Sequence, residues 1–253
     1  MNSSDGSAVA DRDAAIVAAA RRLLTLIDLT SLNDGDTPDA IAALCAKAVT
    51  PFGPVAAVCL YPRFVAQARD LLAGSGVKVA TVANFPRGQA SPATVADEVA
   101  AAIAAGADEI DVVIHFFEPD SAAPAVMASA REASEGKILK VILETGLIGD
   151  KVAVMKCAAA AILGGADFIK TSTGKTATGA TPMAATAMLE AIARFGQGRR
   201  VGFKASGGIR SVAQAWPYLD LAERIIGRSF ARPETLRFGA SALLDDILAL
   251  LGA

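Results

Sequence analysis

The sequence predicts one domain of the α/β class, a (β/α)₈ or TIM barrel with an extra N-terminal helix, that extends over residues 1–253. Runs of β-branched residues alternate with alanine-rich segments of helical periodicity, a pattern typical of a parallel sheet. Eight such strand–helix units follow one another within about 230 residues, which is a usual length for a closed barrel. No linker-like stretch divides them.

The strands are predicted from short runs that are rich in β-branched residues. Each run is followed by turn residues and then by an alanine-rich segment, so each strand belongs to one strand–helix unit. In chain order, the eight predicted strands cover residues 25–30, 55–61, 78–85, 109–116, 138–145, 167–173, 201–206 and 223–229.

The predicted helices between these strands carry recognisable start and stop signals. Three begin with a capping residue followed by proline, at Thr37-Pro38, Ser91-Pro92 and Thr181-Pro182, and others end near glycine. About 22 residues precede the first strand. We expect them to form a helix that closes the bottom of the barrel, with residues 1–12 flexible.

An open, doubly wound sheet is the competing architecture. Its first strand is usually followed by a Gly-rich turn that binds a dinucleotide. The corresponding turn here reads "LTSLNDGDT", which lacks that pattern. The closed barrel is therefore preferred.

Composition indicates a soluble, cytoplasmic protein. Hydrophobic residues make up 53% and the mean hydropathy is +0.43, yet no apolar run reaches the roughly 18–20 residues that span a bilayer. The N-terminus is polar and acidic, unlike a signal or transit peptide. Three scattered cysteines, Cys45, Cys59 and Cys157, suit a reducing compartment.

Several classes of function are disfavoured. A net charge of −2 without a long basic run argues against a nucleic-acid partner, and the absence of a long apolar run argues against a membrane partner. The single histidine, His115, argues against a His-based zinc site and against a Ser–His–Asp triad. We therefore expect chemistry that depends on lysines and carboxylates, with no metal.

Charged residues occupy strand positions that face the barrel interior. Strand side chains alternate in direction, and barrel interiors are usually filled by Val, Ile and Leu. If the apolar residues of each strand face the helices, the inward set includes Asp28, Glu109, Asp111, Lys140, Glu144, Lys170 and Lys204. Most of these charges lie near the carboxyl ends of their strands, where active sites of this fold are built.

Buried charges must be paired or functional, because an unpaired one costs several kcal/mol. A purely structural ion-pair network is the simpler explanation, but it would not require concentration at one end of the barrel. Lys140 and Glu144 are expected to form an ion pair that supports the nucleophile from below.

Two lysines on neighbouring strands suggest Schiff-base chemistry. A lysine attacks a carbonyl only when neutral, and at its reference pKa of about 10.4 fewer than about one in a thousand is neutral at pH 7. Burial and a second ammonium group lower that pKa. Lys170 and Lys204 therefore look like a nucleophile and its perturbing partner, in either order, and Asp111 like a proton carrier.

Glycine and hydroxyl residues gather in three consecutive loops that lead into helices: "TSTGK", "SGGIRS" and "RFGASALL". Backbone N–H groups at such helix starts bind anions, and barrels of this kind often hold a phosphate there. The candidate phosphate-binding residues are Gly174, Lys175, Gly207, Gly208, Arg210, Gly239 and Ser241. They predict a small phosphate ester as the substrate.

The motifs together resemble a known family. "DLTSLNDGDT", "VCLYPRF", "VANFPRG", "GADEIDVV", "LKVILETG", "GADFIKTSTGK", "VGFKASGGIR" and "RFGASALL" follow one another in the order found in deoxyribose-phosphate aldolases of the DeoC type. These are class I, Schiff-base aldolases with a (β/α)₈ fold. The resemblance extends from about residue 24 to about residue 250, and "FIKTSTGK" with "GFKASGGIR" is its most specific part.

The resemblance implies an activity and assigns roles. The family reversibly cleaves 2-deoxy-D-ribose 5-phosphate into acetaldehyde and D-glyceraldehyde 3-phosphate, in the catabolism of deoxyribose and deoxyribonucleotides, without a metal or organic cofactor. It implies that Lys170 forms the Schiff base, assisted by Lys204 and Asp111. The expected substrate-binding residues are Asp28, Thr30, Cys59, Lys140 and Thr173.

Some features depart from the family pattern. "HFFEPD" replaces a proline and tyrosine common in relatives, and we expect a structural or loop role for His115. Ala242 replaces a second serine, and the chain ends at "LALLGA" without the tyrosine-ended tail of some relatives. Relatives are often homodimers, although no self-complementary stripe is visible here. The alternatives are a Schiff-base barrel enzyme that acts on another sugar phosphate, or a non-catalytic barrel that binds a phosphorylated sugar.

Overall fold

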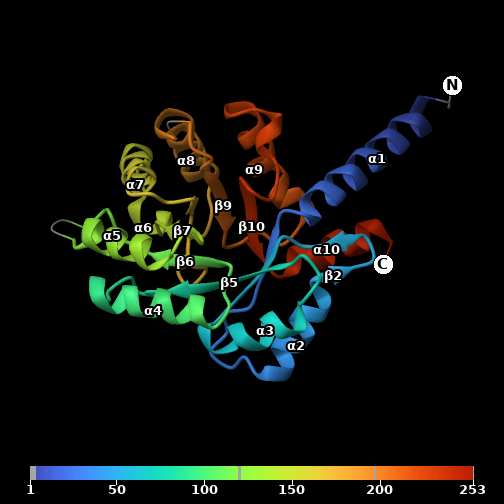
Figure 1. Cartoon of the computed structure of the whole chain (residues 1–253). Coiled ribbons are helices and arrows are strands. Elements are labelled where there is room, and N and C mark those ends of the chain that lie inside the picture. Colours follow the sequence, from blue (N-terminus) through green and yellow to red (C-terminus); the bar gives the residue numbers. More distant parts are fainter. Residues whose placement is uncertain (1–3, 119–120, 197, 253) are drawn as a thin grey trace.

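The eight predicted strand–helix units form a closed barrel of eight parallel strands, which confirms the expected fold class (Figure 1). The computed structural model describes residues 4–118, 121–196 and 198–252, with side chains from residue 14 onward. Around the barrel the strands follow the order β1-β10-β9-β8-β7-β6-β5-β4. Their bounds are β1 Ile27–Thr30, β4 Ala57–Leu60, β5 Lys78–Ala83, β6 Glu109–Val113, β7 Ile138–Ile142, β8 Phe168–Lys170, β9 Gly202–Ser206 and β10 Leu236–Ala240.

The helices surround the barrel and are capped where the sequence predicts. The side chains of Thr37, Ser91 and Thr181 each accept a backbone N–H bond from the first turn of the helix that follows. A short hairpin, β2 Val49–Thr50 and β3 Gly53–Pro54, and a 3₁₀ turn, η1 Pro62–Phe64, lie in the connections. The helices that follow the strands are α2 Pro38–Lys47, α3 Val65–Leu71, α4 Pro92–Ala104, α5 Ala123–Ala133, α6 Thr145–Ile148, α7 Lys151–Leu163, α8 Pro182–Phe195, α9 Val212–Ile225 and α10 Ala242–Leu251.

The prediction of the eighth strand at residues 223–229 is wrong. Helix α9 continues to Ile225, a 3₁₀ turn (η2, Arg228–Phe230) follows, and the strand is β10. A short apolar run does not distinguish a strand from the end of a helix. The first three residues of the run, 223–225, continue helix α9, whose buried residues Ala215, Leu219 and Ala222 recur at helical spacing.

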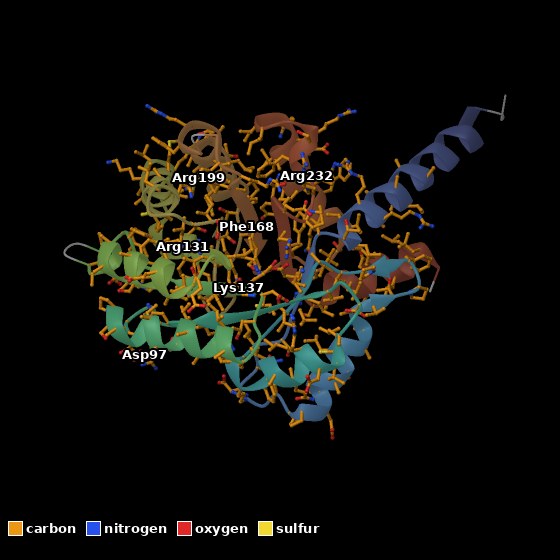
Figure 2. The ribbon with its side chains drawn as sticks, in the orientation of Figure 1. Asp97, Arg131, Lys137, Phe168, Arg199 and Arg232 are labelled. Carbon is orange, nitrogen blue, oxygen red and sulfur yellow. The ribbon has the colours of Figure 1, made fainter. Side chains whose placement is uncertain are left out.

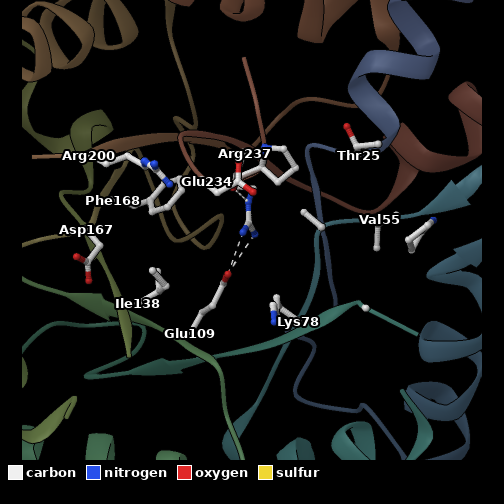
Figure 3. A pocket seen from close by; sticks show the side chains of 14 residues that line it. Thr25, Val55, Lys78, Glu109, Ile138, Asp167, Phe168, Arg200, Glu234 and Arg237 are labelled. Atoms are coloured by element: carbon white, nitrogen blue, oxygen red, sulfur yellow. Dashed lines mark hydrogen bonds and ion pairs between the residues drawn. The ribbon is translucent and has the colours of Figure 1, made fainter. Parts of the chain in front are cut away.

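The N-terminal helix forms, but it does not close the barrel. Helix α1, Ser4–Leu24, packs against α9 and α10 through Ala20, Leu23 and other buried residues near its end, and its first half extends away from the other elements (Figure 1). The amino-terminal end of the barrel is instead hollow, with a cavity of about 760 Å³ (Figure 3). The expected flexibility of residues 1–12 concerns residues 1–3, outside the described ranges, and the start of α1, and stays a prediction. Within the described ranges no helix has the length and apolar character needed to cross a membrane.

The apolar core lies between the strands and the helices rather than inside the barrel. Residues such as Val112, Val141 and Ile169 face the helices and belong to one continuous buried cluster. Figure 2 shows side chains filling the space between ribbon layers, with Phe168 near the middle of the molecule and Asp97 at its edge. Inside the barrel, a smaller apolar group that includes Cys59 of β4, and the ring of Phe168, lie beside the charged residues.

The Phe168 ring occupies the space that a side chain at position 202 would need. Adding a Cβ atom to Gly202 would overlap this ring, while Phe168 is itself only 2% exposed. We expect Gly202→Ala to lower the free energy of unfolding by about 1–3 kcal/mol through overpacking. Urea unfolding at neutral pH measures this.

Gly35 is the matched control, since a Cβ there meets nothing within 4 Å. Gly35→Ala should change the free energy of unfolding by no more than about 0.5 kcal/mol. Equal stability of the Gly202→Ala and Gly35→Ala variants would contradict the close contact with Phe168.

Candidate active site

Seven charged side chains meet inside the barrel. They come from six strands and are at most 5% exposed, and we call them the charged cluster: Asp28 (β1), Glu109 and Asp111 (β6), Lys140 (β7), Lys170 (β8), Lys204 (β9) and Arg237 (β10). Register explains the meeting, because paired residues of neighbouring parallel strands point the same way. Asp111 pairs with Lys140, and Lys204 pairs with both Lys170 and Arg237.

Asp111 lies at the centre of the charged cluster. Its Oδ2 atom accepts hydrogen bonds from the Nζ atoms of Lys170 at 2.8 Å and Lys204 at 2.7 Å. Its Oδ1 atom accepts one from Lys140 at 3.0 Å. Three ammonium groups outweigh the burial that would otherwise raise the pKa of Asp111, so that pKa lies well below its usual value. Asp111 is therefore ionised at neutral pH.

A second tier lies beneath Asp111, toward the amino-terminal end of the strands. Asp28 contacts Lys204 at 2.5 Å, Lys140 at 3.1 Å and Arg237 at 2.5 Å. Glu109 contacts Lys140 at 2.6 Å and Arg237 at 2.9 Å. Each carboxylate thus faces at least two basic groups, which offsets the desolvation of the charges.

The charged cluster favours a neutral amine at one position. It holds four basic side chains and three acidic ones, so its charges balance when one lysine is deprotonated. Burial lowers the pKa of Lys170, and Lys204 lowers it further, with only Asp111 as a strong opposing charge. Burial also lowers the pKa values of Lys140 and Lys204, but the carboxylates outweigh it and raise both. Lys170 is therefore the lysine that most readily becomes a nucleophile.

A cavity of about 380 Å³ opens above Lys170, at the carboxyl ends of the strands. Lys170 is the one member of the charged cluster that lines it in the described part of the chain. All seven predicted phosphate-binding residues line this cavity too, together with the predicted substrate-binding residues Thr30 and Thr173. The structure brings together, around this opening, Gly174, Lys175, Gly207, Gly208, Arg210, Gly239 and Ser241.

Three predicted substrate-binding residues do not line this cavity. Asp28 and Lys140 are fully buried among the ion pairs beneath Asp111. Cys59 lies with its sulfur 4.0 Å from Oδ2 of Asp111, and burial raises the pKa of its thiol. These residues therefore lie beneath the cavity, around Asp111, and their expected role in binding substrate stays a prediction.

The expected ion pair between Lys140 and Glu144 is wrong. Strand β7 ends at Ile142, and Glu144 has a left-handed backbone (φ 51°), so the strand alternation no longer applies to it. Glu144 instead accepts hydrogen bonds from the hydroxyls of Thr173 at 2.5 Å and Thr176 at 3.1 Å. It therefore fixes the loop after β8, which forms one wall of the cavity.

Arg237 is the functional candidate that the sequence did not reveal. The predicted eighth strand begins at residue 223, 13 residues before Leu236, so the alternation expected for that strand does not reach Arg237. The motif "TLRFGAS" would have revealed it, since alternation places Arg237 and Gly239 on the same face.

His115 lies apart from the cavity above Lys170. Its Nδ1 atom is 3.3 Å from Glu118, and it lines a separate cavity of about 250 Å³. Its Nε2 atom is buried with no hydrogen-bond partner among the described residues. Its expected structural or loop role stays a prediction.

The described residues contain no group of three or more His, Cys, Asp or Glu side chains arranged to hold a metal ion. The expectation that neither a metal nor an organic cofactor takes part stays a prediction.

The chain is similar in sequence to known aldolases. Residues 22–245 match the model of the DeoC/LacD family of aldolases. A deoxyribose-phosphate aldolase from Agrobacterium fabrum is 48% identical over 239 residues, covering 92% of each chain.

Solved structures agree with the sequence relationship. The apo crystal structure of a provisionally assigned deoxyribose-phosphate aldolase from Toxoplasma gondii ME49 is 27% identical, with a TM-score of 0.85 over 93% of this chain and 96% of that one. The tetrameric deoxyribose phosphate aldolase of Aeropyrum pernix is 26% identical, with a TM-score of 0.73 over 94% and 97%.

The ion pairs of the charged cluster should make stability fall in acid. The basic groups around Asp28 and Asp111 hold their pKa values below the unfolded value of about 3.9. Their stabilisation is therefore complete above that value and is lost as pH falls. We expect the two groups together to reduce the free energy of unfolding by about 2–3 kcal/mol between pH 5 and pH 3, measured by urea titration.

Asp28→Asn should lose only about half as much stability over the same pH interval, because one of the two titrating groups is gone. Asp97 is exposed on α4, and Asp97→Asn should keep the full pH dependence. The same acid sensitivity in the Asp28→Asn variant as in the wild type would contradict this assignment.

Proposed function

This chain belongs to the DeoC/LacD aldolase family, and we propose that it is a deoxyribose-phosphate aldolase. The reaction is the reversible cleavage of 2-deoxy-D-ribose 5-phosphate into acetaldehyde and D-glyceraldehyde 3-phosphate through a Schiff base on Lys170. The same proposal assigns the protein to the breakdown of deoxyribose and deoxyribonucleotides in the cytoplasm. A homodimer, as in many relatives, stays part of this expectation.

The observation that carries this proposal is the position of Lys170 at the boundary between two environments. Its amine contacts Asp111 on one side, and its side chain lines the cavity on the other. The remaining charged groups lie below it and are already paired. Two lysines line the cavity in the described residues: Lys170, whose amine has a lowered pKa, and Lys175, whose Nζ atom donates to the backbone oxygen of Leu32. An aldehyde that enters the cavity therefore meets, above Asp111, an amine with a lowered pKa.

The chemistry follows from a neutral amine beside a carboxylate. The Lys170 amine adds to C1 of the open-chain sugar, and loss of water gives an iminium ion. Removal of the proton from the C3 hydroxyl breaks the C2–C3 bond, releases glyceraldehyde 3-phosphate and sends the electron pair into the iminium. The resulting enamine takes a proton at C2, and hydrolysis then releases acetaldehyde and the free amine.

Asp111 and Lys204 are the groups nearest to Lys170 for the proton transfers. Because Asp111 is ionised in the free protein, the proton available at the start is held by Lys204, whose pKa is raised by Asp111 and Asp28 against the effect of burial. Both lysines bond to the same Oδ2 atom of Asp111. Asp111 can therefore pass a proton from Lys204 toward the carbinolamine and accept one back.

The phosphate would be bound at the far end of the cavity. Gly207 and Gly208 have φ values of 87° and 83°, which expose their backbone N–H groups in a turn that leads into α9. Ser241 precedes α10 and makes no side-chain capping bond, so the first N–H groups of that helix are available to an anion. Lys175 and Arg210 add positive charge.

The Schiff base is tested by borohydride trapping with acetaldehyde, followed by peptide mass mapping. We expect a two-carbon adduct on Lys170 in the wild type and none in Lys170→Ala. Lys204→Ala should retain some adduct but lose about 10²–10⁴-fold in kcat, the usual contribution of a general acid or base.

Lys156→Ala is the control for trapping, since Lys156 is exposed on α7. It should be labelled at Lys170 like the wild type. Absence of any specific adduct in the wild type, with the protein folded, would exclude the Schiff-base mechanism and favour a barrel that only binds a phosphorylated sugar.

The phosphate site is tested by Lys175→Met. The Nζ atom of Lys175 now donates to the backbone oxygen of Leu32 at 2.6 Å, beside the cavity. Loss of one charged hydrogen bond should raise KM for 2-deoxyribose 5-phosphate at least about 10-fold. Turnover of unphosphorylated 2-deoxyribose, measured in parallel, should stay unchanged. An equal loss with both substrates would show that Lys175 has another role.

A further inference from the structure

Arg237 lies at the bottom of the charged cluster and belongs to no step of the proposed chemistry. Its Nη1 atom donates to Asp28 at 2.5 Å and its Nη2 atom to Glu109 at 2.9 Å. Its Nε atom donates to the backbone oxygen of Pro233, and its guanidinium carbon lies 5.6 Å from the centre of the Phe168 ring. The side chain is thus held on three sides and does not reach the substrate cavity.

The positive charge of Arg237 determines whether the charges of the charged cluster balance when Lys170 is neutral. An arginine cannot lose its proton in a protein, whereas the three lysines can. With Arg237, Lys140 and Lys204 charged, the three carboxylates are already neutralised, and a charged Lys170 would be one buried cation too many. We propose that Arg237 is a positioning residue that supplies this permanent charge and so keeps the Lys170 amine free to attack an aldehyde.

The groups around Lys170 support this role. Asp111 on β6 accepts a hydrogen bond from its amine, and Lys204 on β9 and Cys59 on β4 contact the same Oδ2 atom of Asp111. Behind them lie Lys140, Asp28, Glu109 and Arg237, each in an ion pair. If Arg237 were neutral, the carboxylates would exceed Lys140 and Lys204 by one charge. Protonation of Lys170 would then restore the balance and remove the nucleophile.

The cavity at the amino-terminal end of the barrel gives access to Arg237 from below. Arg237 and Glu109 line this cavity of about 760 Å³, and Figure 3 shows their ion pair among the lining side chains, which include Phe168. The substrate cavity is a separate opening at the carboxyl ends of the strands. A small solute can therefore approach position 237 without competing with the substrate.

The first test is the pH dependence of kcat/KM for 2-deoxyribose 5-phosphate cleavage, which reports ionisations of the free protein. In Arg237→Met the acidic limb, where activity rises as Lys170 loses its proton, should move to higher pH by about one unit or more. In Glu109→Gln, which removes a carboxylate instead, it should move to lower pH. The double variant Glu109→Gln/Arg237→Met should return close to the wild-type limb.

Arg200→Met is the matched control. Arg200 lines the same cavity, but the described residues form no ion pair between it and the charged cluster. Its pH profile should match that of the wild type. A general loss of packing would lower kcat in the single variants without moving their limbs in opposite directions, and the double variant would then be worse than either.

The second test is chemical rescue. Arg237→Ala leaves space for a guanidinium ion beside Asp28 and Glu109, reached through the lower cavity. Guanidinium at millimolar concentration should raise kcat/KM of Arg237→Ala at neutral pH at least about tenfold and shift its acidic limb back toward that of the wild type. Urea, which has a similar shape and no charge, should do neither, and neither compound should activate the wild type.

This inference rests on the proposed Schiff base, and the outcomes separate the two. Failure of wild-type trapping at Lys170 would exclude the proposed function. Normal trapping together with unmoved limbs in Arg237→Met and Glu109→Gln, or rescue by urea as well as by guanidinium, would exclude the role of Arg237 alone. If Arg237→Met does not fold, the shift of the acidic limb of kcat/KM in Glu109→Gln tests whether the charge balance of the cluster controls Lys170.

Discussion

Three lysines converge on the buried carboxylate of Asp111, and this contact determines how the rest of the barrel is built. A charged interior cannot hold the layers of Val, Ile and Leu that usually fill such a barrel. The strands therefore take most of their apolar packing from the helices, and the interior holds a small apolar group near β4 and β5 together with the ring of Phe168. Because removing one partner would leave an uncompensated buried charge, the cluster is maintained as a unit.

Much of this arrangement could be predicted from the sequence, because strand alternation tolerates errors in strand length. The predicted strand at 167–173 is longer than β8, yet the inward direction of Lys170 is unaffected. The same holds for Asp111 and Lys204. Alternation failed where the backbone leaves the strand, as at Glu144 with its positive φ, and where an apolar run belonged to a helix, as at residues 223–229. Composition carries no signal for either case. The assembly of ion pairs beneath Asp111 depends on register between strands, which periodicity alone does not give.

The two ends of the barrel are open for different reasons. The carboxyl-terminal opening is shaped by the loops after β8, β9 and β10, where Glu144 holds Thr173 and glycines allow tight turns. The amino-terminal opening exists because α1 packs on the outside against α9 and α10 instead of crossing the barrel. The charged cluster lies between the two openings, and Lys170 is its one described member that lines the cavity at the carboxyl ends of the strands.

The loops after β8, β9 and β10 are separate from the charged cluster, and this separation affects how the protein can change during evolution. Thr173, Lys175 and Arg210 line the cavity from the loops after β8 and β9, and none of them belongs to the charged cluster. Such loops tolerate insertions and exchanges, whereas each member of the charged cluster other than Lys170 contacts two or more other members. Variation among descendants should therefore accumulate in the three loops as interchangeable units. The charged cluster would change only by paired substitutions. New substrates can therefore be acquired while Lys170 and its ion-pair partners stay the same.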